Sequence, residues 1–177
     1  MKKIMLALFA VSLLALGANA QDTPKANISG GWSMMHLNGS GGASGINLNG
    51  FSASIEKNMN NWFGLVGDFG VYHGSPSGIG TSAESYTFGP RISFRHSDKF
   101  VPYFQALFGG AHLSASALGT TATSNPFAFG FGGGTDIGMT GHIAFRPQFE
   151  YFGLHANSTT QNAERFSVAI VYNFGAK

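Results

Sequence analysis

The segment from Arg165 to Phe174, RFSVAIVYNF, alternates along its whole length between large apolar side chains and small or polar ones. The apolar set runs from Phe166 to Phe174, and Ser167, Ala169 and Val171 belong to the other set. This period of two, enriched in β-branched and aromatic residues, predicts a β-strand whose two faces meet unlike surroundings. Similar segments recur along the chain, and their apolar faces are so large and so many that we expect them to contact lipid.

Eight segments share this alternation, and the connections between them are alternately long and short. We expect strands over residues 27–37, 46–57, 62–73, 85–96, 100–113, 127–139, 142–154 and 165–174. The long connections, at 38–45, 74–84, 114–126 and 155–164, are rich in Gly, Ser, Thr and Ala. Even strand number, long outer loops and short inner turns are typical of outer-membrane barrels. The prediction is an all-β fold, an eight-stranded antiparallel up-and-down transmembrane β-barrel, because closure also satisfies every backbone group in lipid.

Three prolines lie within or at the start of these segments; Pro102 is expected to open its strand, and the other two interrupt the pattern. Pro90 and Pro147 each lack a backbone donor, so we expect a bulge or locally broken pairing at both positions. A soluble ligand-binding barrel is the alternative architecture, and it would place the apolar faces inside. A requirement for detergent would distinguish the membrane barrel from the soluble one.

The first twenty residues have the composition of a secretory signal peptide. Lys2 and Lys3 precede an apolar run, and Ala18-Asn19-Ala20 forms a cleavage site. We expect a signal peptide at 1–20, a short periplasmic tail at 21–26, the barrel at 27–174 and a C-terminal tail at 175–177. Removal of two lysines from the 10 Lys+Arg leaves eight, against 8 Asp+Glu, so the mature chain is uncharged overall and suggests no nucleic-acid partner.

Charged residues are scarce on the predicted strands, and they lie on the polar faces. The candidate interior ion-pair cluster consists of Glu56, Asp68, Arg91, Arg95, Asp136, Arg146 and Glu150. The predicted turns place Asp68 close to opposite Arg91 and Asp136 opposite Arg146. An eight-stranded barrel has room inside only for side chains. These groups must therefore pair with one another, either as a static polar core or as a plug that could rearrange to gate a narrow conduit.

An enzyme that acts on lipid would need a serine and a histidine, with a carboxylate to orient the histidine. The nearest candidates are His155 and Ser158 with Glu150 or Glu164, and ordinary loop polarity explains them better. We predict that the protein is not an enzyme, has no cofactor and has no metal site. The chain contains 0 cysteines, and its histidines lack a tight metal-binding spacing.

Aromatic residues gather near both ends of the predicted strands, as in the interfacial girdles of membrane barrels. The periplasmic girdle is predicted to contain Trp62, Phe63, Phe100, Tyr103, Tyr172 and Phe174, and the outer one Tyr72, Tyr86, Phe127 and Tyr151.

The chain resembles the small OmpA-like and opacity-type barrel domains of Gram-negative outer membranes. The resemblance lies in Tyr86-Thr87-Phe88-Gly89-Pro90-Arg91, Leu107-Phe108-Gly109-Gly110-Ala111 and His142-Ile143-Ala144-Phe145-Arg146-Pro147. Tyr172 and Phe174 are similar to the C-terminal assembly signal of such barrels, although three further residues follow Phe174 here.

The resemblance implies an integral outer-membrane location and contact with outer-membrane lipid and lipopolysaccharide. It also implies recognition by the barrel-assembly machinery through the C-terminal strand, and we expect a monomer. We predict a structural or surface-interaction role. A small low-conductance pore is the alternative, and a lipid-modifying enzyme is the third candidate.

Overall fold

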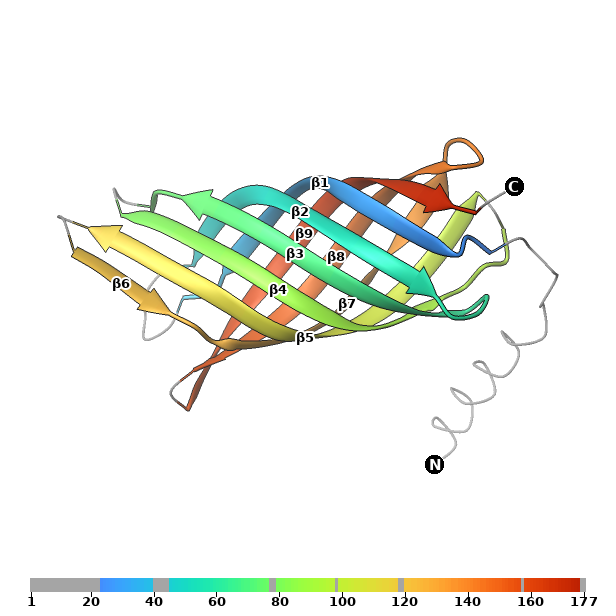
Figure 1. Ribbon diagram of the computed structural model, residues 1–177. Coiled ribbons are helices and arrows are strands. Elements are labelled where there is room, and N and C mark those ends of the chain that lie inside the picture. The colour runs from blue at the N-terminus through green and yellow to red at the C-terminus, as the bar shows by residue number, and fades with distance from the viewer. Residues whose placement is uncertain are drawn as a thin grey trace, which may run out of the picture.

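The computed structural model describes residues 23–39, 45–76, 79–97, 99–117, 120–156 and 158–175. The expected signal peptide lies outside the described residues, as do parts of both tails and of the first long connection. The strands are β1 (Ala26–Leu37), β2 (Ile46–Asn58), β3 (Phe63–Gly74), β4 (Gly80–Ser93), β5 (Phe100–Ala117), β6 (Thr120–Ser124), β7 (Phe127–Gly138), β8 (Ile143–Ala156) and β9 (Thr159–Phe174). Figure 1 shows these strands forming a cylinder and running obliquely to its axis.

All neighbouring strands are antiparallel, and the sheet closes on itself between the first and the last strand. Ala26 pairs with Phe174, and the backbone N–H of Lys25 donates to the Phe174 carbonyl at 2.9 Å. The short β6 and the longer β7 both pair with β5 in a single register, so together they occupy the place of one strand in the barrel wall. Each such place is called a stave here. The barrel therefore has eight staves, and the predicted fold is confirmed.

The inner turns are tight, as the sequence predicts, and two of them share one construction. Between β2 and β3, the Asn60 side-chain oxygen accepts from the N–H groups of Trp62 and Phe63. Between β7 and β8, the Thr140 hydroxyl accepts from the N–H of Ile143 at 3.1 Å. These turns share one end of the barrel with the start of β1 and the end of β9 (Figure 1).

Three of the predicted long loops are largely strand. β4 begins at Gly80, β5 and β6 continue pairing up to Ala117 and Thr120, and β8 extends to Ala156 while β9 begins at Thr159. The sequence prediction was wrong here because these segments are rich in Ser, Thr, Ala and Gly, which indicate loops. The strands nevertheless continue pairing, and threonine suits a pleated, half-exposed ladder.

Neither interrupting proline produces a bulge. The β4–β5 register passes from Phe88–Phe108 to Arg91–Gln105 with no residue inserted around Pro90. Pro147 remains in register with Val168 on β9. Both prolines are therefore accommodated by local gaps in pairing within a continuous ladder, the second of the two outcomes expected from the sequence.

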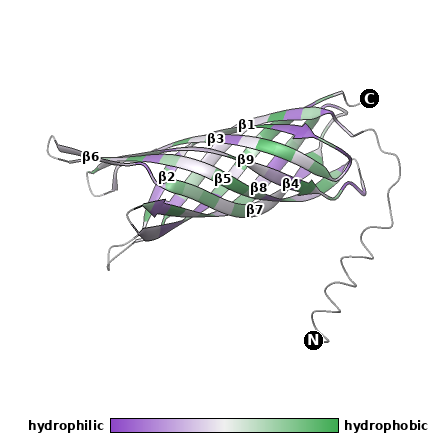
Figure 2. Ribbon diagram, turned by 60° about the horizontal axis from the view of Figure 1, so that its bottom comes forward, coloured by the Kyte–Doolittle hydropathy of each residue, from purple (hydrophilic) through white to green (hydrophobic). Residues whose placement is uncertain are grey.

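The apolar residues face outward, in the sense expected for a barrel surrounded by lipid. Phe88 is 69% exposed and Phe104 is 66% exposed, whereas Arg91 and Gln105 on the same strands are buried. Figure 2 shows hydrophobic residues along the strands of the wall. No helix among the described residues is long and apolar enough to span a membrane. The soluble alternative required the opposite arrangement, with the apolar faces inside.

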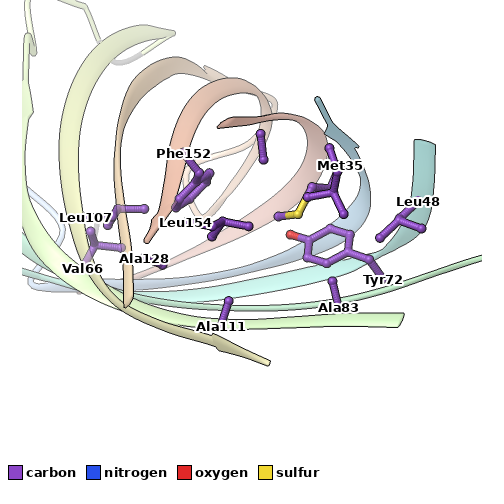
Figure 3. Packing of buried hydrophobic residues seen from close by; sticks show 12 residues of the cluster. Met35, Leu48, Val66, Tyr72, Ala83, Leu107, Ala111, Ala128, Phe152 and Leu154 are labelled. Atoms are coloured by element: carbon purple, nitrogen blue, oxygen red, sulfur yellow. The ribbon is translucent and has the colours of Figure 1, made fainter. Parts of the chain in front are cut away.

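The interior has two parts, and the sequence predicted only one of them. Charged and polar side chains fill the half near the inner turns. An apolar cluster, most of it in the outer half, consists of Met35, Leu37, Leu48, Val66, Tyr72, Ala83, Leu107, Ala111, Ala128, Phe152, Leu154 and Ala163. Figure 3 shows these side chains converging from different strands. Among the described residues, packed apolar side chains thus fill the outer end of the barrel.

Candidate functional site

The lower part of the interior network, nearest the inner turns, is centred on Glu56. Its Oε2 atom accepts from Arg91 Nη1 at 2.6 Å and from Asn27 Nδ2 at 2.8 Å. Arg146 Nη2 lies 3.8 Å from the same oxygen, and the Glu56, Arg91 and Arg146 side chains are each 1% exposed. Side chains from three strands, β1, β4 and β8, thus converge on one carboxylate oxygen of β2, which is the dense pairing that a buried charge requires.

Arg146 is in turn held by Asp136. Arg146 Nε and Nη2 donate to the two Asp136 oxygens at 2.5 and 2.7 Å, a bidentate arrangement between directly opposed residues. The Tyr103 ring packs against both guanidinium groups, with Arg91 Cζ 4.1 Å and Arg146 Cζ 5.1 Å from its centroid. Both cations are therefore within cation–π distance of one aromatic ring, which stabilises both.

The upper part of the network is centred on Arg165, which is fully buried. Its Nη1 donates to Asp68 Oδ1 at 2.6 Å and to the Tyr72 hydroxyl at 3.2 Å, and its Nε donates to Glu150 Oε2 at 2.5 Å. Asp68 belongs to β3 and Glu150 to β8, so the guanidinium spans the lumen. Tyr72 connects this arginine to the apolar cluster above it.

Two glutamines join the lower and upper parts. Gln105 accepts from Arg91 Nε at 2.8 Å and donates to Glu150 Oε1 at 2.6 Å. Gln148 donates to Glu150 Oε2 at 2.7 Å and accepts from the Tyr103 hydroxyl at 2.5 Å. An unbroken chain of hydrogen bonds and ion pairs therefore crosses the lumen and runs along it.

Arg95 lies beyond the end of β4, at the inner mouth of the barrel. Its Nη2 donates to Asn58 Oδ1 at 3.0 Å. Burial lowers the pKa of Arg95, and the carboxylates of Glu56 and Asp136 partly oppose that effect. With Arg95, the described residues of the interior include four guanidinium groups and four carboxylates, so their formal charges cancel.

One expected pairing is wrong. Asp68 opposes Thr87, and Arg91 opposes Gly64, so Asp68 and Arg91 are four residues apart in the register. Each finds another partner instead, because the outer connection is shorter than expected and because long arginine side chains reach across the lumen. The partner of Asp68 is Arg165, which is not a member of the predicted cluster. Arg165 is two residues before the polar-face residue Ser167, and this spacing is the signal that identifies it as inward-facing.

The candidates for a lipid-modifying site do not come together. The Nδ1 atom of His155 is bonded to the Thr160 hydroxyl at 2.9 Å. Glu150 is buried against Arg165, and Glu164 opposes His36 and Tyr151 in the register. Within the described residues, His155 therefore has no carboxylate to orient it. No three metal-ligating side chains gather among those residues either.

The aromatic girdles need two corrections. Tyr103 is 2% exposed and Tyr72 is fully buried, so both belong to the interior. Tyr172 and Phe174 do face outward, and they contact each other edge-to-face with ring centroids 4.9 Å apart. Their role as an assembly signal stays a prediction.

A closed antiparallel barrel with an apolar outer wall and a charged, paired interior is the architecture of integral outer-membrane β-barrel proteins. The chain belongs to the outer membrane protein beta-barrel domain family, whose pattern it matches over residues 6–174. The protein is accordingly an integral protein of the bacterial outer membrane.

Solved structures with a similar fold share little sequence with the chain. Neisserial surface protein A superposes with a TM-score of 0.72 at 14% identity, covering 85% of this chain and 97% of that one. Ail, the attachment invasion locus protein of Yersinia pestis, gives 0.64 at 17% identity, with 86% and 99% covered. The N-terminal barrel domain of Pseudomonas aeruginosa OprF gives 0.59 at 11% identity, with 84% and 98% covered. Comparison with curated proteins gives no match.

Proposed function

We propose that this protein is a non-enzymatic component of the outer membrane with a closed interior and a structural or surface-interaction role. One observation supports this most directly: the charge network is continuous with the apolar cluster. Arg165 contacts Asp68 and Glu150 on one side and Tyr72, a member of the apolar cluster, on the other. A lumen filled by both kinds of packing leaves the outer surface as the part that can meet partners.

The β5–β6 hairpin is the best candidate for such contacts. It extends beyond the other strands at the end opposite the termini (Figure 2), and Thr120, Thr121 and Thr123 on it are exposed. Ail has been solved in complex with the heparin analogue sucrose octasulfate. A polyanion of that kind is a poor match for this chain, whose described lysines, Lys25, Lys57 and Lys99, all lie near the inner turns. Hydroxyl-rich strands favour neutral glycans.

Binding to an array of neutral and sulfated glycans tests the surface-interaction role. The probe is the barrel in lipid nanodiscs, compared with a variant carrying Thr120→Ala, Thr121→Ala and Thr123→Ala. We expect the wild type to bind neutral glycans and the variant to lose that binding, whereas Thr140→Ala at the inner end leaves it unchanged. Equal binding by all three proteins would contradict the assignment to the hairpin.

The small-pore alternative has one observation in its favour. Ser85 Oγ and Thr87 Oγ1 on β4 are buried in the lumen without a hydrogen-bond partner among the described residues. Polar groups of this kind usually bond to protein or to ordered water. A thin file of water along β4 would therefore suit the geometry, and conductance measurements distinguish a hydrated file from an open pore.

The lipid-modifying alternative is tested by mass spectrometry of lipid A from cells with and without expression. Unchanged spectra are expected, because His155 bonds to Thr160 and not to a carboxylate. Loss of an acyl chain on expression would restore the enzyme hypothesis.

We further propose that residues 1–20 direct export, that Tyr172 and Phe174 engage the assembly machinery, and that the barrel is monomeric. Outward-facing Tyr172 and Phe174 at the closing strand support the second point. N-terminal sequencing of the membrane protein is expected to begin at Gln21. Replacement of both aromatics by alanine is expected to reduce the amount of assembled barrel.

A further inference from the structure

Four histidines lie on the outward face near the outer end of the barrel, one on each strand that runs toward that end. They are His36 on β1, His73 on β3, His112 on β5 and His155 on β8. Every second stave of the wall therefore carries one histidine. The two remaining histidines, His96 and His142, lie at the inner turns.

The strand register places these four residues at one height. Their cross-strand neighbours are Asn47 and Asn49 on β2, Ser82 and Glu84 on β4, Asn125 and Phe127 at the start of β7, and Thr160 and Glu164 on β9. On each strand between two histidines, the partners of those two histidines are offset along the strand. The offset is two residues on β2, two on β4, two at the start of β7 and four on β9. The total of ten residues is the shear of the barrel. An even share of the ten residues would be two and a half for each of the four steps between neighbouring histidines, so the path forms a nearly level belt.

Three of the four imidazoles are held in a fixed orientation. The Nδ1 atom of His36 lies 2.6 Å from Asn47 Oδ1, that of His112 lies 2.6 Å from Asn125 Oδ1, and that of His155 lies 2.9 Å from Thr160 Oγ1. An amide oxygen can only accept, so Nδ1 carries the proton in the first two pairs. Nε2 is then the site that gains a proton when the ring becomes charged.

Among the residues that the structure describes, this belt contains the only groups that can carry positive charge on the outer half of the lipid-facing wall. The described lysines lie at the inner end, and the arginines point into the lumen or lie at its inner mouth. Glu164 opposes His36, and Glu84 opposes His112 and lies diagonally from His73. His155 faces only Phe127 and Thr160.

We propose that this histidine belt binds the phosphate groups of outer-leaflet lipids, and does so more strongly as the pH falls. Histidine is the side chain that ordinarily changes charge between pH 5 and 8. A protonated imidazole donates through Nε2, and a lipid phosphate oxygen at the membrane interface can accept. The proposal rests on the position of the barrel in the membrane and not on whether its lumen is closed.

Electron spin resonance with spin-labelled lipids tests this. The barrel is refolded in phosphatidylcholine bilayers, and the motionally restricted fraction of spin-labelled phosphatidylglycerol is compared with that of labelled phosphatidylcholine at pH 5.5 and 8. The single phosphate charge of phosphatidylglycerol does not change in this range. We expect its relative association to rise about twofold at the lower pH, the scale of exposed ion pairs.

The decisive variant carries His36→Asn, His73→Asn, His112→Asn and His155→Asn, and it is expected to lose most of that rise. The matched control, His96→Asn with His142→Asn, removes the inner histidines and is expected to keep it. If the fourfold variant does not refold, His73→Asn with His155→Asn is expected to lose about half of the rise. An unchanged rise in the variants of the outer belt, or its loss in the inner control, would overturn the proposal.

Discussion

Arg165 on β9 reaches across the lumen to Asp68 on β3, with 2.6 Å between Nη1 and Oδ1, although two strands separate them in the wall. The same guanidinium binds Glu150 on β8. One side chain thereby connects two opposite parts of the barrel, so the shape of the lumen depends on it.

Replacing Arg165 with methionine is expected to destabilise the barrel by about 3–5 kcal/mol, because two buried carboxylates lose their cation. Urea unfolding of the refolded barrel in lipid vesicles measures this. The combination of Arg165→Met with Asp68→Asn and Glu150→Gln leaves no uncompensated charge at this site, and it should recover most of the loss. No recovery in the triple variant would show that shape and not charge determines the effect.

Tyr103 contributes through both its ring and its hydroxyl, and two substitutions separate them. Tyr103→Phe removes the bond to Gln148 and is expected to cost about 0.5–1.5 kcal/mol. Tyr103→Leu also removes the ring that contacts Arg91 and Arg146, and should cost more, since cation–π contacts in buried sites contribute up to about 2 kcal/mol. Equal unfolding free energies for the two variants would contradict a role for the ring.

Gly70 on β3 lies under the Tyr72 side chain, and a Cβ atom there would lie 2.3 Å from the Tyr72 hydroxyl oxygen. Gly70→Ala is therefore expected to displace Tyr72 from Arg165 and to cost about 1–3 kcal/mol by overpacking. Gly67→Ala is the matched control on the same strand, because its nearest neighbour would be Ile55 Cγ2 at an ordinary 3.7 Å. Adding Tyr72→Ala to Gly70→Ala relieves the crowding. Equal unfolding midpoints for Gly70→Ala and Gly67→Ala would contradict the close approach.

Alternation alone predicted the eight staves and the inward or outward direction of most side chains. The same rule also held at the places where it was set aside. Tyr72 lies on the same strand face as Asp68, and Tyr103 on the same face as Gln105, because each pair is separated by an even number of residues. Both tyrosines therefore point inward, but their aromatic character suggested a membrane girdle. Arg165 likewise lies on the same inward face as Ser167.

The partners inside the lumen could not be predicted from local sequence. A guanidinium on one strand contacts carboxylates on strands that are not its neighbours, and the shear of the closed barrel determines which ones it reaches. The apolar cluster at the outer end went unnoticed for a related reason. Its members come from eight of the nine strands, and none of those strands alone shows an apolar inner face.

The closed lumen is tested most directly by planar-bilayer conductance of the refolded mature chain, recorded beside Arg91→Ala. The wild type is expected to show no discrete openings, because Arg91 bonds to both Glu56 and Gln105 in a lumen that is packed above and below. Arg91→Ala is expected to remain silent too, since the Arg165 cluster and the apolar cluster still close the path. Discrete openings in the wild type whose size changes in Arg91→Ala would contradict the closed barrel and establish the pore.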